Sequence, residues 1–104
     1  MAQSMFYITV ENMEEAERIS KQLVEDRLVA CINVFPQIQS FFYWEGKAQN
    51  EGETLMMGKT QTKLVERLVD RVKELHSYDV PCVVTWEIHK GNPEFLSWID
   101  EETS

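Results

Sequence analysis

The chain has 104 residues, of which 43% are hydrophobic, a size and composition typical of one globular domain with a single core. Its 18 acidic and 10 basic residues give a net charge of −8, which argues against nucleic-acid partners and anionic membrane surfaces, because both are bound through Lys and Arg. No stretch has the length of a membrane span and no N-terminal segment has a signal-peptide pattern, so we expect one cytoplasmic domain over residues 1–104 without membrane insertion.

The N-terminal quarter of the sequence predicts a strand followed by a helix. Residues 5–10 are mostly β-branched and aromatic, with apolar side chains at a period of two. Asn12 followed by Glu15 resembles a capping box, so a helix is expected to begin there and to run to about Arg27. Its apolar residues recur at helical spacing: Ala16, Ile19, Leu23 and Val24.

Residues 30–59 predict a long aromatic hairpin. Val, Ile, Phe, Tyr and Trp dominate residues 30–44, residues 45–47 form a turn signal, and residues 55–57 are the apolar part of a return strand. Pro36 lacks a backbone N–H and therefore marks an edge position, a bend or a bulge.

The length and the tip of this hairpin favour assembly. A strand of about 14 residues spans roughly 46 Å, whereas a domain of this size is roughly 34 Å across, so the hairpin must curl or project. Its tip carries four consecutive aromatic residues, 41–44, which would be an aggregation hazard if left bare. We predict burial against another copy of the chain; the alternative is a bent hairpin folded onto its own core.

The C-terminal half predicts a helix, a strand and a short final helix. Thr60 or Thr62 is expected to cap the first of these helices, whose apolar stripe is Leu64, Leu68, Val72 and Leu75. Residues 82–89 read as a fourth strand, Asn92-Pro93 begins the final helix, and residues 101–104 are expected to fray. The order β-α-β-β-α-β plus a helix is the α+β, ferredoxin-like plan, with an antiparallel sheet and helices on one side.

Lys59 has two interpretations. Gly58-Lys59-Thr60 resembles the end of a phosphate-binding loop, but Glu53 stands where that loop requires Gly. In the first interpretation, Lys59 and the N-terminus of the following helix hold an anion. In the second, Lys59 forms an ordinary ion pair with an acidic neighbour. A hydrolase would need an Arg or Asn placed on a phosphate-binding loop, and the segment after the first strand, residues 11–14, has a net acidic character instead.

Metal ligation is the more open question, because HxH, CxxC and HExxH spacings are missing from the sequence. The candidate ligands are His76, His89, Cys31, Cys82, Glu87 and Met57. His89 and Glu87 share a strand face, and His76 is either a dipole-favoured helix cap or a ligand. Both cysteines are expected to be buried, unreactive thiols. Ligation by His with Cys or Met would suit copper better than magnesium.

Several blocks of the sequence resemble the CutA family of divalent-cation tolerance proteins. They are LVACINV at residues 28–34 with Pro36 and Ser40, YWEGK at 43–47, Lys59-Thr60, HSYDVP at 76–81 and GNPEFLSWI at 91–99. The resemblance covers nearly the whole chain. It implies a fold similar to the PII signalling proteins, a stable homotrimer whose strands pair between subunits, tolerance to copper and other divalent metals, and no firmly attached catalytic activity.

The site residues implied by this resemblance carry over only in part. Family members proposed to bind copper have a Cys in the first strand and two consecutive His, where this chain has Ile8 and Leu75-His76. His76 is thus the one matching metal ligand. The residues that fit the family's inter-subunit pocket are Tyr43, Trp44, Glu53, Lys59 and Tyr78.

Two hypotheses follow for the function. In the first, the protein is a CutA-like homotrimer of the divalent-metal response, which binds Cu²⁺ or another divalent cation weakly and requires no cofactor. In the second, it is a PII-like signalling or adaptor trimer that binds a small anionic ligand at the subunit clefts.

Overall fold

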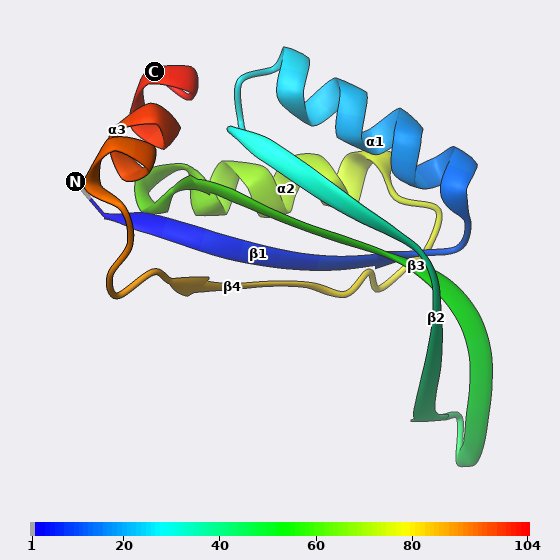
Figure 1. Ribbon diagram of the computed structural model, residues 1–104. Coiled ribbons are helices and arrows are strands. Elements are labelled where there is room, and N and C mark those ends of the chain that lie inside the picture. Colours follow the sequence, from blue (N-terminus) through cyan, green and yellow to red (C-terminus); the bar gives the residue numbers. More distant parts are fainter. Residues whose placement is uncertain (1) are drawn as a thin grey trace.

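A computed structural model describes residues 2–104 and contains a four-stranded antiparallel sheet in the order β2-β3-β1-β4 (Figure 1). The elements in chain order are β1 (Gln3–Val10), α1 (Met13–Glu25), β2 (Cys31–Trp44), β3 (Lys47–Gln61), a 3-10 turn η1 (Thr62–Leu64), α2 (Val65–Leu75), β4 (Val83–Glu87) and α3 (Pro93–Glu102). This is the ferredoxin-like α+β order expected from the sequence, with the final helix added.

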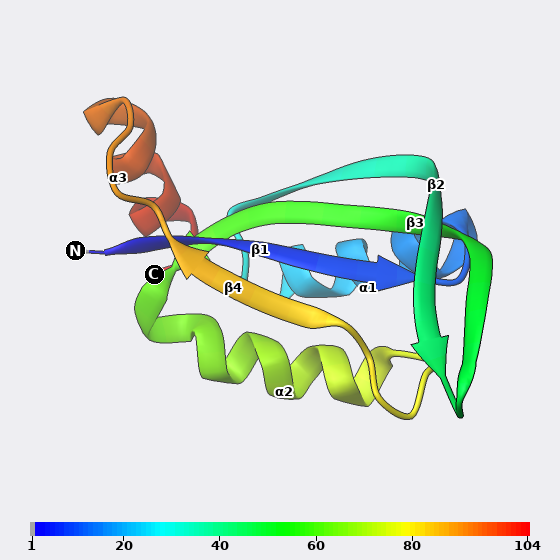
Figure 2. The same ribbon diagram turned by 90° about the horizontal axis from the view of Figure 1, so that it is seen from below.

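The hydrophobic core lies between the sheet and the two long helices. Helices α1 and α2 cover one face of the sheet, and within residues 2–104 no helix covers the opposite face along most of its length (Figures 1 and 2). Phe6 and Ile8 of β1 and Met56 of β3 point into the core and are fully buried, together with Leu23 and Leu68 from the helices. Since strand side chains alternate between faces, every second residue of these strands points to the uncovered face.

The β2–β3 hairpin is bent by a bulge at Pro36. Phe35 pairs with Leu55 and Ile38 pairs with Glu53, so β2 advances three residues while β3 advances two. The Pro36 carbonyl accepts a 2.9 Å hydrogen bond from the Thr54 hydroxyl. Beyond the bulge, the hairpin turns away from the helices and projects past the sheet (Figure 1), which gives the chain extents of 44 × 26 × 23 Å.

The hairpin tip confirms the predicted turn and stays exposed. Glu45 and Gly46 both have positive φ, 49° and 78°, as a two-residue turn between twisted strands requires. The aromatic side chains of the tip are not folded back onto the core: their exposed fractions are 75% for Phe41, 74% for Tyr43 and 54% for Trp44. The alternative of a hairpin packed on its own core is therefore wrong for this chain.

Helix α1 ends two residues before the predicted boundary. Arg27 adopts a left-handed conformation, with φ of 59°. Its N–H donates to the carbonyl of Val24 and the N–H of Leu28 donates to the carbonyl of Leu23, which is the Schellman arrangement that ends a helix. Gly is the usual residue at that position, so Arg27 gave no stop signal in the sequence.

Both threonines predicted to cap the second helix have other roles. Thr60 lies in β3, and its buried hydroxyl donates a 2.7 Å hydrogen bond to the Leu28 carbonyl. The Thr62 hydroxyl is 2.8 Å from that of Ser4. The chain enters α2 through the 3-10 turn, with no capping hydrogen bond from the Gln61 side chain.

Two further expectations are corrected near the C-terminus. Strand β4 covers Val83–Glu87 rather than residues 82–89, so Cys82 precedes the strand and is exposed rather than buried. The predicted fraying is also wrong, because α3 continues to Glu102 and Thr103 is buried. The Thr103 hydroxyl donates to the Ile99 carbonyl at 2.7 Å and accepts from Gln61 Nε2 at 3.0 Å.

Candidate functional site

A polar network joins the loop after α2 to the hairpin. The Tyr78 hydroxyl donates a 2.9 Å hydrogen bond to Glu53 Oε2, and the Ser40 hydroxyl donates a 2.6 Å hydrogen bond to Glu53 Oε1. Burial raises the pKa of Tyr78 above its ordinary range, and the Glu53 carboxylate together with Glu11 and Glu51 raises it further. Tyr78 therefore remains a hydrogen-bond donor at neutral pH and ties the base of the projecting hairpin to the domain.

His76 continues this network into the core of the domain. Its Nδ1 accepts a 3.0 Å hydrogen bond from the Tyr78 N–H, so the ring proton of the neutral imidazole lies on Nε2. Nε2 then donates to the Thr9 carbonyl at 2.7 Å. The ring is buried and lies 4.7 Å from that of Tyr78 between centroids. Both ring nitrogens are thus occupied by backbone groups.

Glu15 holds the other side of the same loop. Its Oε1 accepts from the Glu11 N–H at 3.1 Å and its Oε2 accepts from the Ser77 N–H at 2.7 Å. Burial acts to raise the pKa of Glu15, but the hydrogen bonds from Glu11 and Ser77 outweigh burial and lower the pKa. The sequence indicated Glu15 only as a capping residue; its bond to Ser77, 62 residues away, is tertiary.

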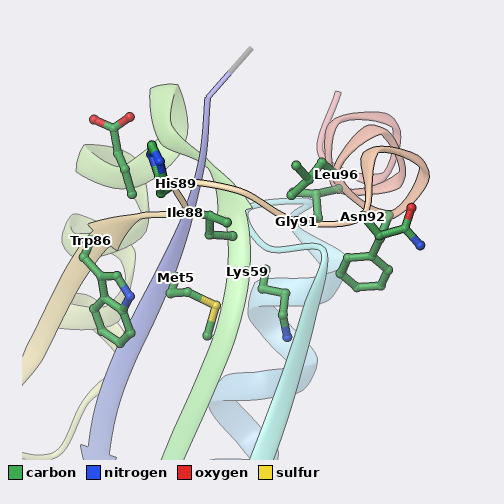
Figure 3. Close-up of a pocket in the computed structure, with 11 residues that line it drawn as sticks. Met5, Lys59, Trp86, Ile88, His89, Gly91, Asn92 and Leu96 are labelled. Atoms are coloured by element: carbon green, nitrogen blue, oxygen red, sulfur yellow. The ribbon is translucent and has the colours of Figure 1, made fainter.

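A cavity of about 530 Å³ lies at the other end of the sheet, between the ends of β1, β3 and β4 and helix α3. Figure 3 shows Met5, Lys59 and Trp86 pointing to the same side of the sheet, while His89 points to the opposite side. The Lys59 ammonium lies 5.9 Å from the centre of the Phe95 ring. Lys59 takes part in none of the ion pairs formed among residues 2–104.

The structure brings together only two of the five pocket residues expected from the sequence. Glu53 and Tyr78 are hydrogen-bonded. Lys59 is six residues further along β3, or about 20 Å at strand spacing. Tyr43 and Trp44 are exposed at the hairpin tip. A pocket containing all five would have to include more than one chain, and it stays a prediction.

No metal site is assembled within the single described chain. Among residues 2–104, no group of three or more His, Cys, Asp or Glu side chains is placed to hold an ion. His76 has no free ring nitrogen, because each nitrogen is hydrogen-bonded to the backbone. The side chains present therefore do not fit a resident ion in one chain, and His76 as a ligand stays a prediction.

The fold and these features define a ferredoxin-like α+β domain with a projecting hairpin and an uncovered sheet face. Residues 4–102 match the family model of the CutA1 divalent ion tolerance proteins. The chain belongs to this family. In the described part of the chain, helices are too short or too polar to cross a bilayer.

Known relatives are similar to this protein in sequence and structure over almost the whole chain. The divalent-cation tolerance protein CutA of Archaeoglobus fulgidus is 48% identical over 98 residues, 94% of this chain and 95% of its own. Its structure, described as that of a periplasmic protein, superposes with a TM-score of 0.95 at 45% identity and covers 98% of this chain and 99% of its own. CutA1 of Oryza sativa superposes with a TM-score of 0.97 at 36% identity, over 100% of this chain and 95% of its own.

Human Protein CutA is longer than the archaeal relative. It is 40% identical over 100 residues, which are 96% of this chain but 56% of the human protein. The chain thus spans a little over half of that relative and nearly all of the archaeal one.

Proposed function

We propose that the protein is a homotrimer that takes part in the response to divalent metal ions. The observation that carries the assembly is the uncovered face of the sheet. Phe35, Val84 and Trp86 lie on this face, with exposed fractions of 47%, 52% and 46%. Exposed large apolar side chains on both edge strands of one sheet face are typical of an interaction surface.

The hairpin supplies a second apolar surface, at a different place on the chain. Its aromatic tip projects beyond the domain. A contact between the tip of one copy and another surface of the next copy is heterologous, and heterologous contacts close into rings when the rotation permits. A three-membered ring is the copy number that the family resemblance implies.

The role in metal response is supported by the relatives. The similar proteins from Archaeoglobus fulgidus and Thermus thermophilus are both named divalent-cation tolerance proteins. The net charge of −8 raises the local concentration of cations. We propose that Cu²⁺ or another divalent cation binds weakly and that no ion is needed for folding.

His76 is the ligand to test. An ion at Nδ1 must displace the Tyr78 N–H, and the loss of a hydrogen bond costs about 0.5–1.5 kcal/mol, which is why the proposed affinity is weak. The experiment is equilibrium dialysis against Cu²⁺ with wild type, His76→Gln and, as control, the exposed His89→Gln. The proposal expects the bound copper to fall only in His76→Gln. Unchanged stoichiometry in that variant would remove His76 as a ligand.

A second candidate function is the binding of a small anionic ligand, as in a PII-like signalling or adaptor protein. The observation in its favour is the cavity beside Lys59, whose ammonium has no ion-pair partner within residues 2–104. A thermal-shift screen of nucleotides and carboxylates tests it. We expect at least one ligand class to raise the unfolding temperature. The absence of any such rise at millimolar ligand concentration would contradict this candidate function.

We further propose that the protein acts by binding rather than catalysis, and in the cytoplasm. His76 is occupied by two backbone hydrogen bonds, so it is not free to activate a nucleophile.

Cys31 and Cys82 are free thiols, as a reducing compartment maintains them. Cell fractionation tests the location, and recovery in a periplasmic fraction would contradict it.

A further inference from the structure

We draw no further inference here: the strongest candidate, the polar groove of about 420 Å³ between the C-terminal end of α1 and helix α2, is lined by charged side chains that pair with one another, as Arg71 does with Asp26 and Glu74, and neither of the two buried unpartnered side-chain atoms within residues 2–104 lines it, so nothing in the structure shows what would occupy it.

Discussion

The Tyr78 hydroxyl donates a 2.9 Å hydrogen bond to Glu53, 25 residues earlier in the chain. The same carboxylate accepts from Ser40 at 2.6 Å, so Glu53 connects both hairpin strands to the loop after α2. Because the hairpin has left the helices at this point, these bonds hold its base in a fixed orientation. An assembly that uses the hairpin tip depends on that orientation.

Replacing Tyr78 by Phe is expected to lower the free energy of unfolding by about 1–3 kcal/mol, because a hydrogen bond to a charged acceptor is lost. Chemical denaturation measures the change. Tyr43→Phe, which removes an exposed hydroxyl at the hairpin tip, is the matched control and should cost little. Equal effects of the two substitutions would show that the bond to Glu53 does not stabilise the fold.

The raised pKa of Tyr78 predicts a loss of stability at high pH. The folded pKa lies above the ordinary value of 10.0, so the contribution is fully present below pH 10 and is lost as the pH rises through the folded pKa. Alkaline unfolding curves of wild type and Tyr78→Phe should therefore converge as Tyr78 ionises. A difference between them that is constant at all pH values would contradict the assignment.

Glu15 predicts the opposite pH dependence. Its folded pKa lies below the ordinary value of 4.5, so its contribution is present above pH 4.5 and disappears as the pH falls through the folded pKa. Glu15→Gln should cost about 1–3 kcal/mol at neutral pH, since an amide NH₂ would face a backbone N–H. The exposed Glu14→Gln is the control. A constant cost down to strongly acidic pH would exclude the carboxylate as the cause.

Gly58 lies where β3 closely approaches its neighbours. A Cβ there would lie 2.3 Å from both the Cys31 carbonyl oxygen and the Phe6 ring, so Gly58→Ala should destabilise the fold by about 3 kcal/mol. At Gly52 the nearest atom to such a Cβ is Gln39 Nε2, at 3.8 Å, and Gly52→Ala serves as the control. Thermal unfolding of both variants is the measurement, and equal stability would contradict this packing.

The order of the elements and the hairpin could be predicted from the sequence because they depend on local patterns. Each of these patterns sets the conformation of only a few neighbouring residues: the alternating apolar residues, the Glu45-Gly46 turn and Pro36. The capping role of Asn12 is equally local, and its side chain accepts from the Glu15 N–H at 2.9 Å.

The polar network could not be predicted in the same way, because its bonds join distant segments. His76 and Thr9 are 67 residues apart. The hydrogen bond between them occupies Nε2 of His76, the histidine that the sequence predicts as a metal ligand. Position in the sequence alone predicts Thr60 or Thr62 as a helix cap, yet the Thr60 hydroxyl donates to the Leu28 carbonyl, 32 residues away. Such pairings are set by the packing of strands and helices rather than by spacing in the sequence.

A charge on the uncovered face should weaken assembly without unfolding the domain. Val84 lies on that face and is 52% exposed, whereas Val24 of α1 is 47% exposed. Val84→Lys is expected to raise the fraction of monomer, because assembly would bury the ammonium, and Val24→Lys to leave the oligomer unchanged. Analytical ultracentrifugation measures both. Dissociation by both variants alike would argue against this face as the interface.

The most direct test of trimer formation is native mass spectrometry of wild-type protein purified without a metal-affinity column. We predict a particle of three chains, each of 12.2 kDa, that persists on dilution to submicromolar concentration. A particle with the mass of one chain at every concentration would contradict the proposed use of the uncovered sheet face and the projecting hairpin.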